Sequence, residues 1–402
     1  MSTETVPKGY KRTEVGVIPE EWICSDLGSI CNRVTTGKLD ANAMVENGEY
    51  RFYTCARSWY YINSFAFDDE ALLISGNGAN VGYIHYYNGK FNAYQRTYVL
   101  AQFNASIKYL QHYMGRNLSD RIRVEVNAGN TPYITRGTLT EMQLALPPTV
   151  AEQQAIAAAL SDADALIESL EQLLAKKRQI KQGAMQELLT GKLRLPGFSG
   201  EWETKKFPDV CWFQEGPGVR NTQFTDSGIK LLNGTNIASG HLDLSTTSRF
   251  IAESEAYGPY AHFMADINDI VLASSGITIE KLHNKVAIVT ESDLPFCMNT
   301  STIRFKPASI LNHSFLFQYL KSDLFKNEIG GQATGSAQLN FGPSHVATVS
   351  INLPPLPEQT AIAAVLSDID SELEAIEAKL DKARQVKQGM MQQLLTGKVR
   401  LV

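Results

Sequence analysis

Two stretches of this chain place their apolar residues with the period of an α-helix. In the second stretch, Glu358–Leu401, apolar residues recur in steps of three and four. That spacing gathers them into one stripe, which is typical of a helix that packs lengthwise against another helix. The first stretch, Glu152–Leu195, has the same stripe, with Lys177 as its one polar member. Each pattern predicts a helix of about 38 residues, or ~57 Å.

The two stretches are copies of one another. They align without a gap at a separation of 206 residues, and 28 of the 44 aligned residues are identical. Proline-rich lead-ins, LALPPTVAEQ and INLPPLPEQ, precede them, and Gly191 and Gly397 stand where helices commonly end. The SD pairs at Ser161 and Ser367 are able to cap a new helix, so the sequence also allows a kink at each of them.

A single apolar stripe needs a partner, and three partners are open: its own domain, a second chain, or the other copy of the helix. We expect the two copies to pair with each other, antiparallel, within one chain, because each is attached to its own domain. The residues predicted to form the seam are Ile156, Leu160, Ile167, Leu170, Leu174, Ile180, Leu188, Ile362, Leu366, Ile369, Leu373, Ile376, Leu380, Val386, Met390 and Leu394.

The segments that precede the helices form a second, weaker repeat. The stretch EALLISGNGANVGYI from Glu70 parallels NDIVLASSGITIEKL from Asn268, each with an apolar strand, a turn of small residues and a second strand. The sequence therefore predicts an α+β fold of two α/β domains, each followed by a long helix, with pseudo-twofold symmetry. The predicted segments are 1–148 for the N-terminal segment and first domain, 149–196 for the central helix, 197–355 for the second domain and 356–402 for the C-terminal helix.

The composition is that of a soluble globular protein. Of 402 residues, 44% are hydrophobic and 20% are charged, and no apolar run approaches the length of a membrane span. The N-terminus lacks the apolar core of a signal peptide, and the five cysteines are scattered, so we expect a cytoplasmic protein. The net charge of −5 is unusual for a protein devoted to nucleic acid.

The chain resembles the specificity subunit of type I restriction-modification systems. The helix entries PPTVAEQQAIAAAL and PPLPEQTAIAAVL, the two KQGxMQxLLTGKxRL helix exits and the opening GVIPEEW carry this resemblance, which spans the whole chain. It implies that the domains are target recognition domains, each reading half of a bipartite double-stranded DNA sequence. It also implies that the helices dock two methyltransferase subunits, that restriction subunits join them, and that S-adenosylmethionine and ATP bind to those partners and not to this chain.

No catalytic motif contradicts that expectation. LLTGK lacks the upstream glycine of a phosphate-binding loop, and the acidic run Asp68–Glu70 has no companion ligands for a metal. A fusion with a nuclease or methylase is disfavoured, because the two halves leave no room for a catalytic domain. The alternative from another class is a non-catalytic coiled-coil adaptor whose two α/β domains bind protein or glycan.

Base edges in the major groove are read by Arg, Lys, Asn, Gln, Ser and Thr side chains. The candidates are Arg57, Asn77, Asn80, Arg96, Thr131, Tyr133 and Arg136 in the first domain, and Arg220, Asn221, Ser274, Ser275, Thr278, Lys281, Gln332, Thr334, Gln338 and Asn340 in the second. The first domain, Trp22–Pro148, holds 11 basic and 10 acidic residues, and the second, Trp202–Pro355, holds 11 and 14. We therefore expect the isolated chain to bind DNA weakly, because phosphate contacts supply much of the affinity.

Overall fold

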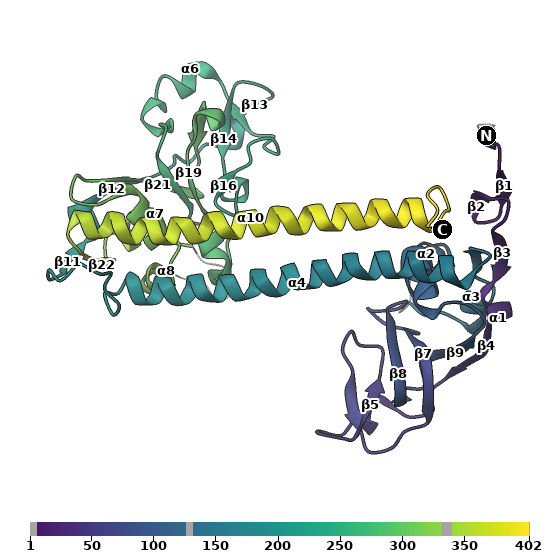
Figure 1. Cartoon of the computed structure of the whole chain (residues 1–402). Helices are drawn as coiled ribbons and strands as arrows, with labels where there is room; N and C mark the ends of the chain where they lie inside the picture. Colours follow the sequence, from purple (N-terminus) through teal and green to yellow (C-terminus); the bar gives the residue numbers. More distant parts are fainter. Residues whose placement is uncertain (1–5, 126–131, 331–339, 402) are drawn as a thin grey trace. The chain divides into compact units, whose positions relative to one another are not determined.

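The computed structural model describes residues 6–125, 132–330 and 340–401. It divides into two compact units: unit 1 is Met1–Glu171 with Ala378–Val402, and unit 2 is Gln172–Glu377. Two helices of 39 residues, α4 (Val150–Leu188) and α10 (Leu356–Leu394), each run through both units (Figure 1). Each unit therefore contains one α/β domain, the first part of one long helix and the last part of the other.

The first domain is built on a six-stranded sheet of order β4-β9-β7-β8-β5-β6. Its central hairpin joins β7 to β8 in an unbroken antiparallel register from Phe67↔Phe91 to Ile74↔Ile84. The strands of this sheet are β4 (Cys31–Thr36), β5 (Tyr50–Tyr53), β6 (Tyr60–Ile62), β7 (Phe67–Ser75), β8 (Ile84–Ala93) and β9 (Thr97–Phe103). The other elements are β1 (Tyr10–Thr13), β2 (Gly16–Pro19), β3 (Ile23–Asp26), α1 (Leu27–Ile30), the 3-10 turn η1 (Ala41–Ala43), α2 (Ile107–Glu125), α3 (Arg136–Thr140) and β10 (Gln143–Leu146).

The core of unit 1 joins parts of the chain that are far apart in sequence. Trp22 and Leu160 are fully buried in one apolar cluster, and Leu394 and Leu395 of the α10 end lie in the same cluster. Burying a leucine side chain stabilises a fold by roughly 1.5–3 kcal/mol. The first domain thus depends on residues that follow the second domain in the sequence.

The second domain has two four-stranded sheets, β12-β21-β18-β19 and β13-β17-β14-β20. Its elements begin with β11 (Glu203–Lys206), α5 (Phe207–Val210), β12 (Cys211–Glu215), η2 (Asn221–Gln223), β13 (Phe224–Thr225), β14 (Ile229–Leu232), η3 (Gly234–Asn236), β15 (Ile237–Ala238), β16 (His241–Leu242), β17 (Phe250–Ile251), α6 (Glu253–Ala256) and η4 (Ala261–Phe263). They continue with β18 (Ile270–Ala273), η5 (Ile279–Asn284), β19 (Val286–Ile288), η6 (Glu291–Asp293), β20 (Phe296–Met298), β21 (Thr302–Pro307), α7 (His313–Leu320), α8 (Asp323–Gly330), α9 (Pro343–Val346) and β22 (Ser350–Leu353).

The two domains share one topology. The order β4-β9-β7-β8 of the first domain matches β12-β21-β18-β19 of the second. In the first domain the end of β8 pairs in parallel with β5, and in the second the separate strand β20 pairs in parallel with β14. The single strand β8 therefore corresponds to both β19 and β20. This repeat of two α/β domains, each followed by a long helix, confirms the predicted α+β fold class.

Within each unit, ion pairs join the parts of α4 and α10 that it contains. Three pairs of unit 1, Arg384–Glu171, Lys387–Asp164 and Arg400–Glu152, correspond to three pairs of unit 2, Arg178–Glu377, Lys181–Asp370 and Arg194–Glu358. Arg400 and Arg194 lie just beyond the ends of α10 and α4, and unit 2 has one further pair, Lys177–Glu372. Each pair of unit 1 becomes a pair of unit 2 when 206 residues are added to one number and subtracted from the other. Residue numbers rise along one helix while they fall along the other, which agrees with the predicted antiparallel direction.

The stripe predicted for the two helices is buried or half-buried except at one position in each copy. Ile180 and Val386 are 47% and 46% exposed. Lys181 and Lys387, one residue further on, occupy the inner face instead and pair with the aspartates of the other helix. At the helix starts the stripe packs on the α/β domain, since Ile156 lies in the first domain core. Ile362 lies in the second domain core in the same way.

Neither long helix is interrupted at its SD pair. α4 continues through Ser161, whose hydroxyl lies 3.0 Å from His112 Nε2, and α10 continues through Ser367. No helix in the three described ranges is both long and apolar enough to cross a bilayer.

Candidate nucleic-acid interface

In the first domain, turns that follow four different strands are joined by backbone hydrogen bonds. The amide of Gly76, after β7, donates to Arg96 O (2.9 Å), after β8. The amide of Tyr94 donates to Tyr53 O (2.9 Å) at the end of β5. Gly37, after β4, comes so close that a Cβ placed on it would lie 1.8 Å from Ala93 O, which only glycine avoids. We call residues 37–39, 54–57, 76–83, 94–96 and 132–134 the first turn cluster.

The second domain has the same arrangement of turns. The amide of Ser274, after β18, donates to Ser301 O (2.9 Å), and the amide of Phe341 donates to Ser274 O (3.0 Å). The corresponding bond in the first domain runs from Ile134 N to Gly76 O (2.9 Å). A Cβ on Gly216 would lie 2.4 Å from Asn299 O, as at Gly37. The two domains therefore present different side chains on a shared backbone arrangement.

Several predicted residues meet in the first turn cluster. Arg57 Nε donates to Asn80 Oδ1 (3.3 Å), and Asn80 Nδ2 donates to Cys55 O (3.0 Å). The Arg57 guanidinium lies 5.8 Å from the centre of the Tyr83 ring. Asn77 forms a β-bridge with Tyr133, which is 62% exposed. Arg57, Asn77, Asn80 and Tyr133 thus lie on one polar and aromatic surface.

The remaining candidates of the first domain are less closely connected. Arg96 and Arg136 have exposed side chains, the first in the turn after β8 and the second at the start of α3. Thr131 lies outside the described residues. Beneath the cluster His85 contacts Ala56 O (2.9 Å), and burial lowers the pKa of this imidazole although that hydrogen bond opposes the shift. His85 therefore supports the 54–57 turn through its contact with Ala56 O.

The sequence did not single out Arg51, which is held between two aromatic rings. Its guanidinium lies 4.2 Å from the centre of the Trp59 ring and 4.6 Å from that of Tyr87. Trp59 is 43% exposed, while Ile62 and Phe67 of the same aromatic run, SWYYINSFAF at 58–67, are buried. The run is thus half core and half surface, and an apolar sequence alone does not show where an arginine will stack on it.

We call residues 233–236, 246–249, 275–278 and 299–301 the second turn cluster, and these residues line a polar cleft of about 620 Å³ in unit 2. Ser275, Thr278 and Lys281 line it, as do Asn233, Arg249 and Thr300, which the sequence did not single out. Asn340 fixes one wall, because its Oδ1 accepts from Ser275 Oγ (2.8 Å) and from Gly276 N (3.1 Å).

The floor of this cleft is also fixed by hydrogen bonds. Asn299 Nδ2 donates to Asn233 Oδ1 (2.9 Å), which links the turn after β20 to the turn after β14. Lys285 Nζ donates to Gly234 O (3.1 Å) and Ile237 O (2.6 Å). Burial, and then the charge of Lys281, lowers the pKa of Lys285. Both turns are therefore held in place before any ligand arrives.

One predicted contact residue of the second domain is wrong. Ser274 is fully buried, because it continues the inward-facing alternation of β18, and its side chain does not reach the cleft. Arg220 and Asn221 are exposed, but Arg220 caps the 3-10 turn η2 and Asn221 begins it, and neither residue lines the cleft. Gln332, Thr334 and Gln338 lie outside the described residues.

The chain is thus a tandem repeat of one α/β domain and one long helix, and each domain exposes a turn cluster of its own. The family model for the type I restriction modification DNA specificity domain matches it twice, over residues 19–181 and 199–384. The chain belongs to this family.

Relatives of similar length support this assignment. The specificity subunit of the type I restriction enzyme EcoDI from Escherichia coli is 27% identical over 92% of this chain and 85% of its own. The MjaVIII specificity subunit from Methanocaldococcus jannaschii is 26% identical over 96% of this chain and 94% of its own. The solved S subunit from M. genitalium covers 93% of this chain and 96% of its own at 15% identity, with a TM-score of 0.63, so the fold is shared.

Proposed function

We propose that this chain is the DNA sequence-specificity subunit of a type I restriction-modification complex. Each domain reads one half of a bipartite double-stranded target through its turn cluster. The observation that carries the proposal is the pair of turn clusters, which have the same backbone hydrogen bonds but different side chains. Such a pair suits two readers of one kind that recognise two different half-sites.

The side chains of the clusters suit base edges better than a phosphate backbone. The cleft of unit 2 is lined by amide and hydroxyl groups, with few cations among them. Amides and hydroxyls donate to and accept from base edges, whereas phosphate neutralisation needs lysine and arginine. The two domains are close to neutral, so partner subunits supply most of the phosphate contacts.

The partners follow from the same proposal. Two methyltransferase subunits dock on the helices, because the helix pair offers two segments related by the 206-residue shift, and restriction subunits join that complex. Chemistry, S-adenosylmethionine and ATP belong to those partners, and this chain is not catalytic. Membership of the family favours this function over an adaptor that binds protein or glycan.

Exchanging one domain tests the proposal. Residues Trp22–Pro148 are replaced by the equivalent domain of a relative, and modified bases are mapped across the genome of cells that carry the complex. We expect one half-site to change while the other stays the same. A change in both half-sites, or in neither, would contradict separate reading by the two domains.

A gel-shift experiment separates the two classes of function. We expect the isolated chain to bind its target duplex weakly and the complex with methyltransferase subunits to bind it tightly. An adaptor would show no sequence-specific shift in either form. The control duplex carries both half-sites with a spacer altered by two base pairs.

A further inference from the structure

The two domains differ in how their sheets are held together. In the first domain β7 and β8 pair without interruption, so one hairpin runs through the whole six-stranded sheet. In the second domain β18 pairs with β19 only from Ile270↔Ile288 to Leu272↔Val286. β20 is a separate strand that pairs with β14 in the other sheet. The two sheets of the second domain therefore have no strand in common.

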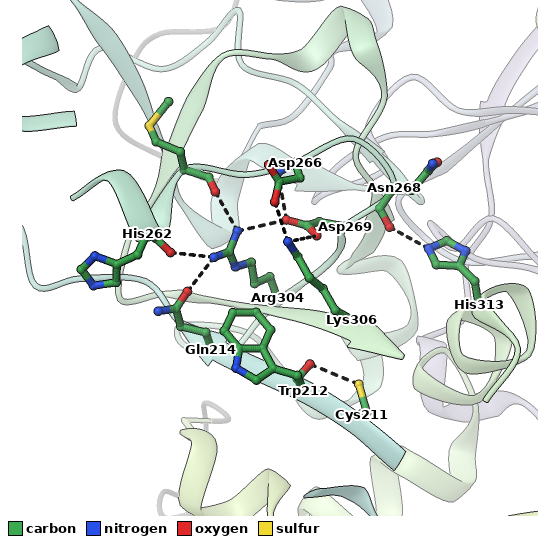
Figure 2. A network of polar contacts seen from close by, with 11 residues as sticks. Cys211, Trp212, Gln214, His262, Asp266, Asn268, Asp269, Arg304, Lys306 and His313 are labelled. Atoms are coloured by element: carbon green, nitrogen blue, oxygen red, sulfur yellow. Dashed lines mark hydrogen bonds and ion pairs between the residues drawn. The ribbon is translucent and has the colours of Figure 1, made fainter. Parts of the chain in front are cut away.

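A buried ion pair lies where the hairpin is interrupted. Arg304 of β21 is 5% exposed, and Figure 2 shows its guanidinium among four acceptors. Its Nη1 donates to Asp269 Oδ2 (3.1 Å) and Met264 O (2.7 Å). Its Nη2 donates to His262 O (2.6 Å) and Gln214 Oε1 (2.8 Å). The side chain of Arg304 thus connects β21 and β12, which belong to the sheet β12-β21-β18-β19, to the segment 262–269.

That segment leads directly to the other sheet. Met264 forms a β-bridge with Cys297 of β20, and the amide of Ala265 donates to Phe296 O (3.2 Å). β20 ends at Met298, and the next residues, Asn299–Ser301, line the cleft. Arg304 is therefore linked through 262–265 and β20 to the cleft turn.

Neighbouring side chains complete the cluster. Lys306 contacts Asp266 (2.5 Å) and Asp269 Oδ1 (3.4 Å), and its hydrogen bond to Asp266, followed by its charge, holds the pKa of Asp266 below its usual value although burial opposes the shift. The Arg304 guanidinium also lies 5.0 Å from the centre of the Trp212 ring. With a planar, charged group that donates in several directions, arginine is suited to such a junction and lysine is not.

The strand register shows what stands at this place in the first domain. Arg304 pairs with Val271 of β18, and the matching pair of the first domain is Val99 with Leu73 of β7. An apolar valine suffices there, because the uninterrupted hairpin already connects the strands. A buried ion pair is weak evidence for added stability, since desolvation of the two charges offsets their attraction. Its position at the interruption is better explained by a role in geometry.

We propose that Arg304 is a positioning residue for sequence recognition by the second domain. It holds β20, and with it the turn Asn299–Ser301, in register with the turns after β18 and β14. The inference rests on the proposed function, because it assigns a role to a residue beneath the cleft that reads DNA. It adds a specificity determinant that does not itself touch the bases.

The test uses the full chain in complex with its methyltransferase subunits. Arg304→Lys keeps the charge but loses the fork of donors. The double variant Arg304→Met with Asp269→Asn removes both charges, so that neither is left buried alone. The matched control is Arg33→Met, which breaks the Arg33–Asp69 pair (2.5 Å) between β4 and β7 of the first domain, where the hairpin is uninterrupted.

Two readouts are measured for each variant. The first is the rate of modification on duplexes that carry single-base changes in either half-site. We expect Arg304→Lys and the double variant to lose discrimination about ten-fold at the half-site of the second domain and to keep it at the other. The second is amide hydrogen exchange, which we expect to become faster at Ala265 and Asn299 and to stay unchanged in the two long helices. The control changes neither readout.

The inference is overturned if both Arg304 variants discriminate at the second half-site as the wild type does. Should the double variant fail to assemble, Arg304→Lys decides by the same criterion. Failure of the proposed function gives a different result: the wild-type complex would then show no base preference, and Lys281→Ala in the cleft would change nothing. A loss that affects both half-sites equally would indicate general destabilisation and would also overturn the inference.

Discussion

At the scale of single residues, two aspartates connect the helices to the domains. Asp370 of α10 pairs with Lys181 of α4, accepts from Gln318 Nε2 (2.9 Å) and lies 3.5 Å from Lys321. The matching residue of unit 1, Asp164, pairs with Lys387 and lies 3.8 Å from His112 Nδ1. Gln318 and His112 come from the α/β domains. Each aspartate thus contacts both the other helix and the domain of its own unit.

The pH dependence of stability should reflect Asp370. Burial raises the pKa of this carboxyl, but Lys321 and the hydrogen bonds from Lys181 and Gln318 outweigh burial and hold the pKa below its ordinary value. Because the pKa of Asp370 is lower in the folded state than in the unfolded state, its carboxylate stabilises the fold at pH values above the unfolded pKa, near 3.9. This stabilisation is lost as the pH falls below that value. We expect Asp370→Asn to cost about 2 kcal/mol at pH 7 and less as the pH falls toward 3.

Urea unfolding of both proteins between pH 3 and pH 8 measures this difference. Asp368→Asn, at an exposed position on the same helix, is the control and should leave the free energy of unfolding unchanged. A cost for Asp370→Asn that stays the same down to pH 3 would show that the charge of Asp370 does not contribute.

The residues of the candidate interface were predictable only where local pattern decides them. Ser275, Thr278 and Lys281 follow an apolar strand, so a turn with polar side chains was expected there. The turn began one residue later than expected, because Ser274 still points inward. Asn233 and Thr300 reach the cleft from turns far away in the sequence, and nothing near them marks them. Their role depends on the pairing of β14 with β20, which is long-range.

At the scale of elements, the apolar seam is the part of the helix pair that is most sensitive to substitution. Leu380 is 5% exposed in unit 1, and an aspartate there would be a lone carboxylate on an apolar face. We expect Leu380→Asp to cost several kcal/mol and to prevent assembly with the methyltransferase subunit. Leu373→Asp, at 9% exposure in unit 2, should act in the same way.

Thermal unfolding and light scattering of the complex measure the two effects. Val386→Asp introduces the same side chain on the same helix at a position that is 46% exposed, and it should leave both measurements close to wild type. Normal assembly of Leu373→Asp and Leu380→Asp would contradict the pairing of the two helices.

The length and the apolar stripe of both helices were readable from the sequence, because their period is regular over many turns. The sequence alone does not show that Ile180 and Val386 leave the apolar stripe and are exposed to solvent. Lys181 takes the inner face only because Asp370 stands opposite, and that aspartate is 189 residues away. The interrupted hairpin of the second domain was hidden in the same way, since its stretch aligns well with the continuous one of the first domain.

At the scale of the whole molecule, one ion pair distinguishes the two helices. Lys177 pairs with Glu372 in unit 2, but the residues that the 206-residue shift assigns to them are Ala383 and Leu166. A second copy of α4 in place of α10 would keep the partners of Arg178, Lys181 and Arg194, because Glu171, Asp164 and Glu152 repeat those of α10. It would place Lys177 opposite Leu166.

We therefore expect the N-terminal half, Met1 to about Gly197, to form a homodimer that selects a pseudo-palindromic site. Leu166→Glu should strengthen this dimer about five-fold, because it adds two exposed ion pairs with Lys177. Sedimentation equilibrium measures the dimer, and Ser169→Glu at a nearby exposed position is the control. A half that stays monomeric in both forms would mean that α10 cannot be replaced by a second α4.

The division of the chain into units also sets an order in time. Unit 2 is one continuous stretch of sequence, whereas unit 1 is closed by Leu394, Leu395 and Arg400, which the ribosome makes after all of unit 2. Domains usually fold in the order of their synthesis. Here the domain that is made first is completed last, and until then Trp22 and its neighbours lack part of their apolar cover. A nascent chain that stops before residue 390 would carry a finished second domain and an unfinished first one, a state that cellular proteases can recognise and remove.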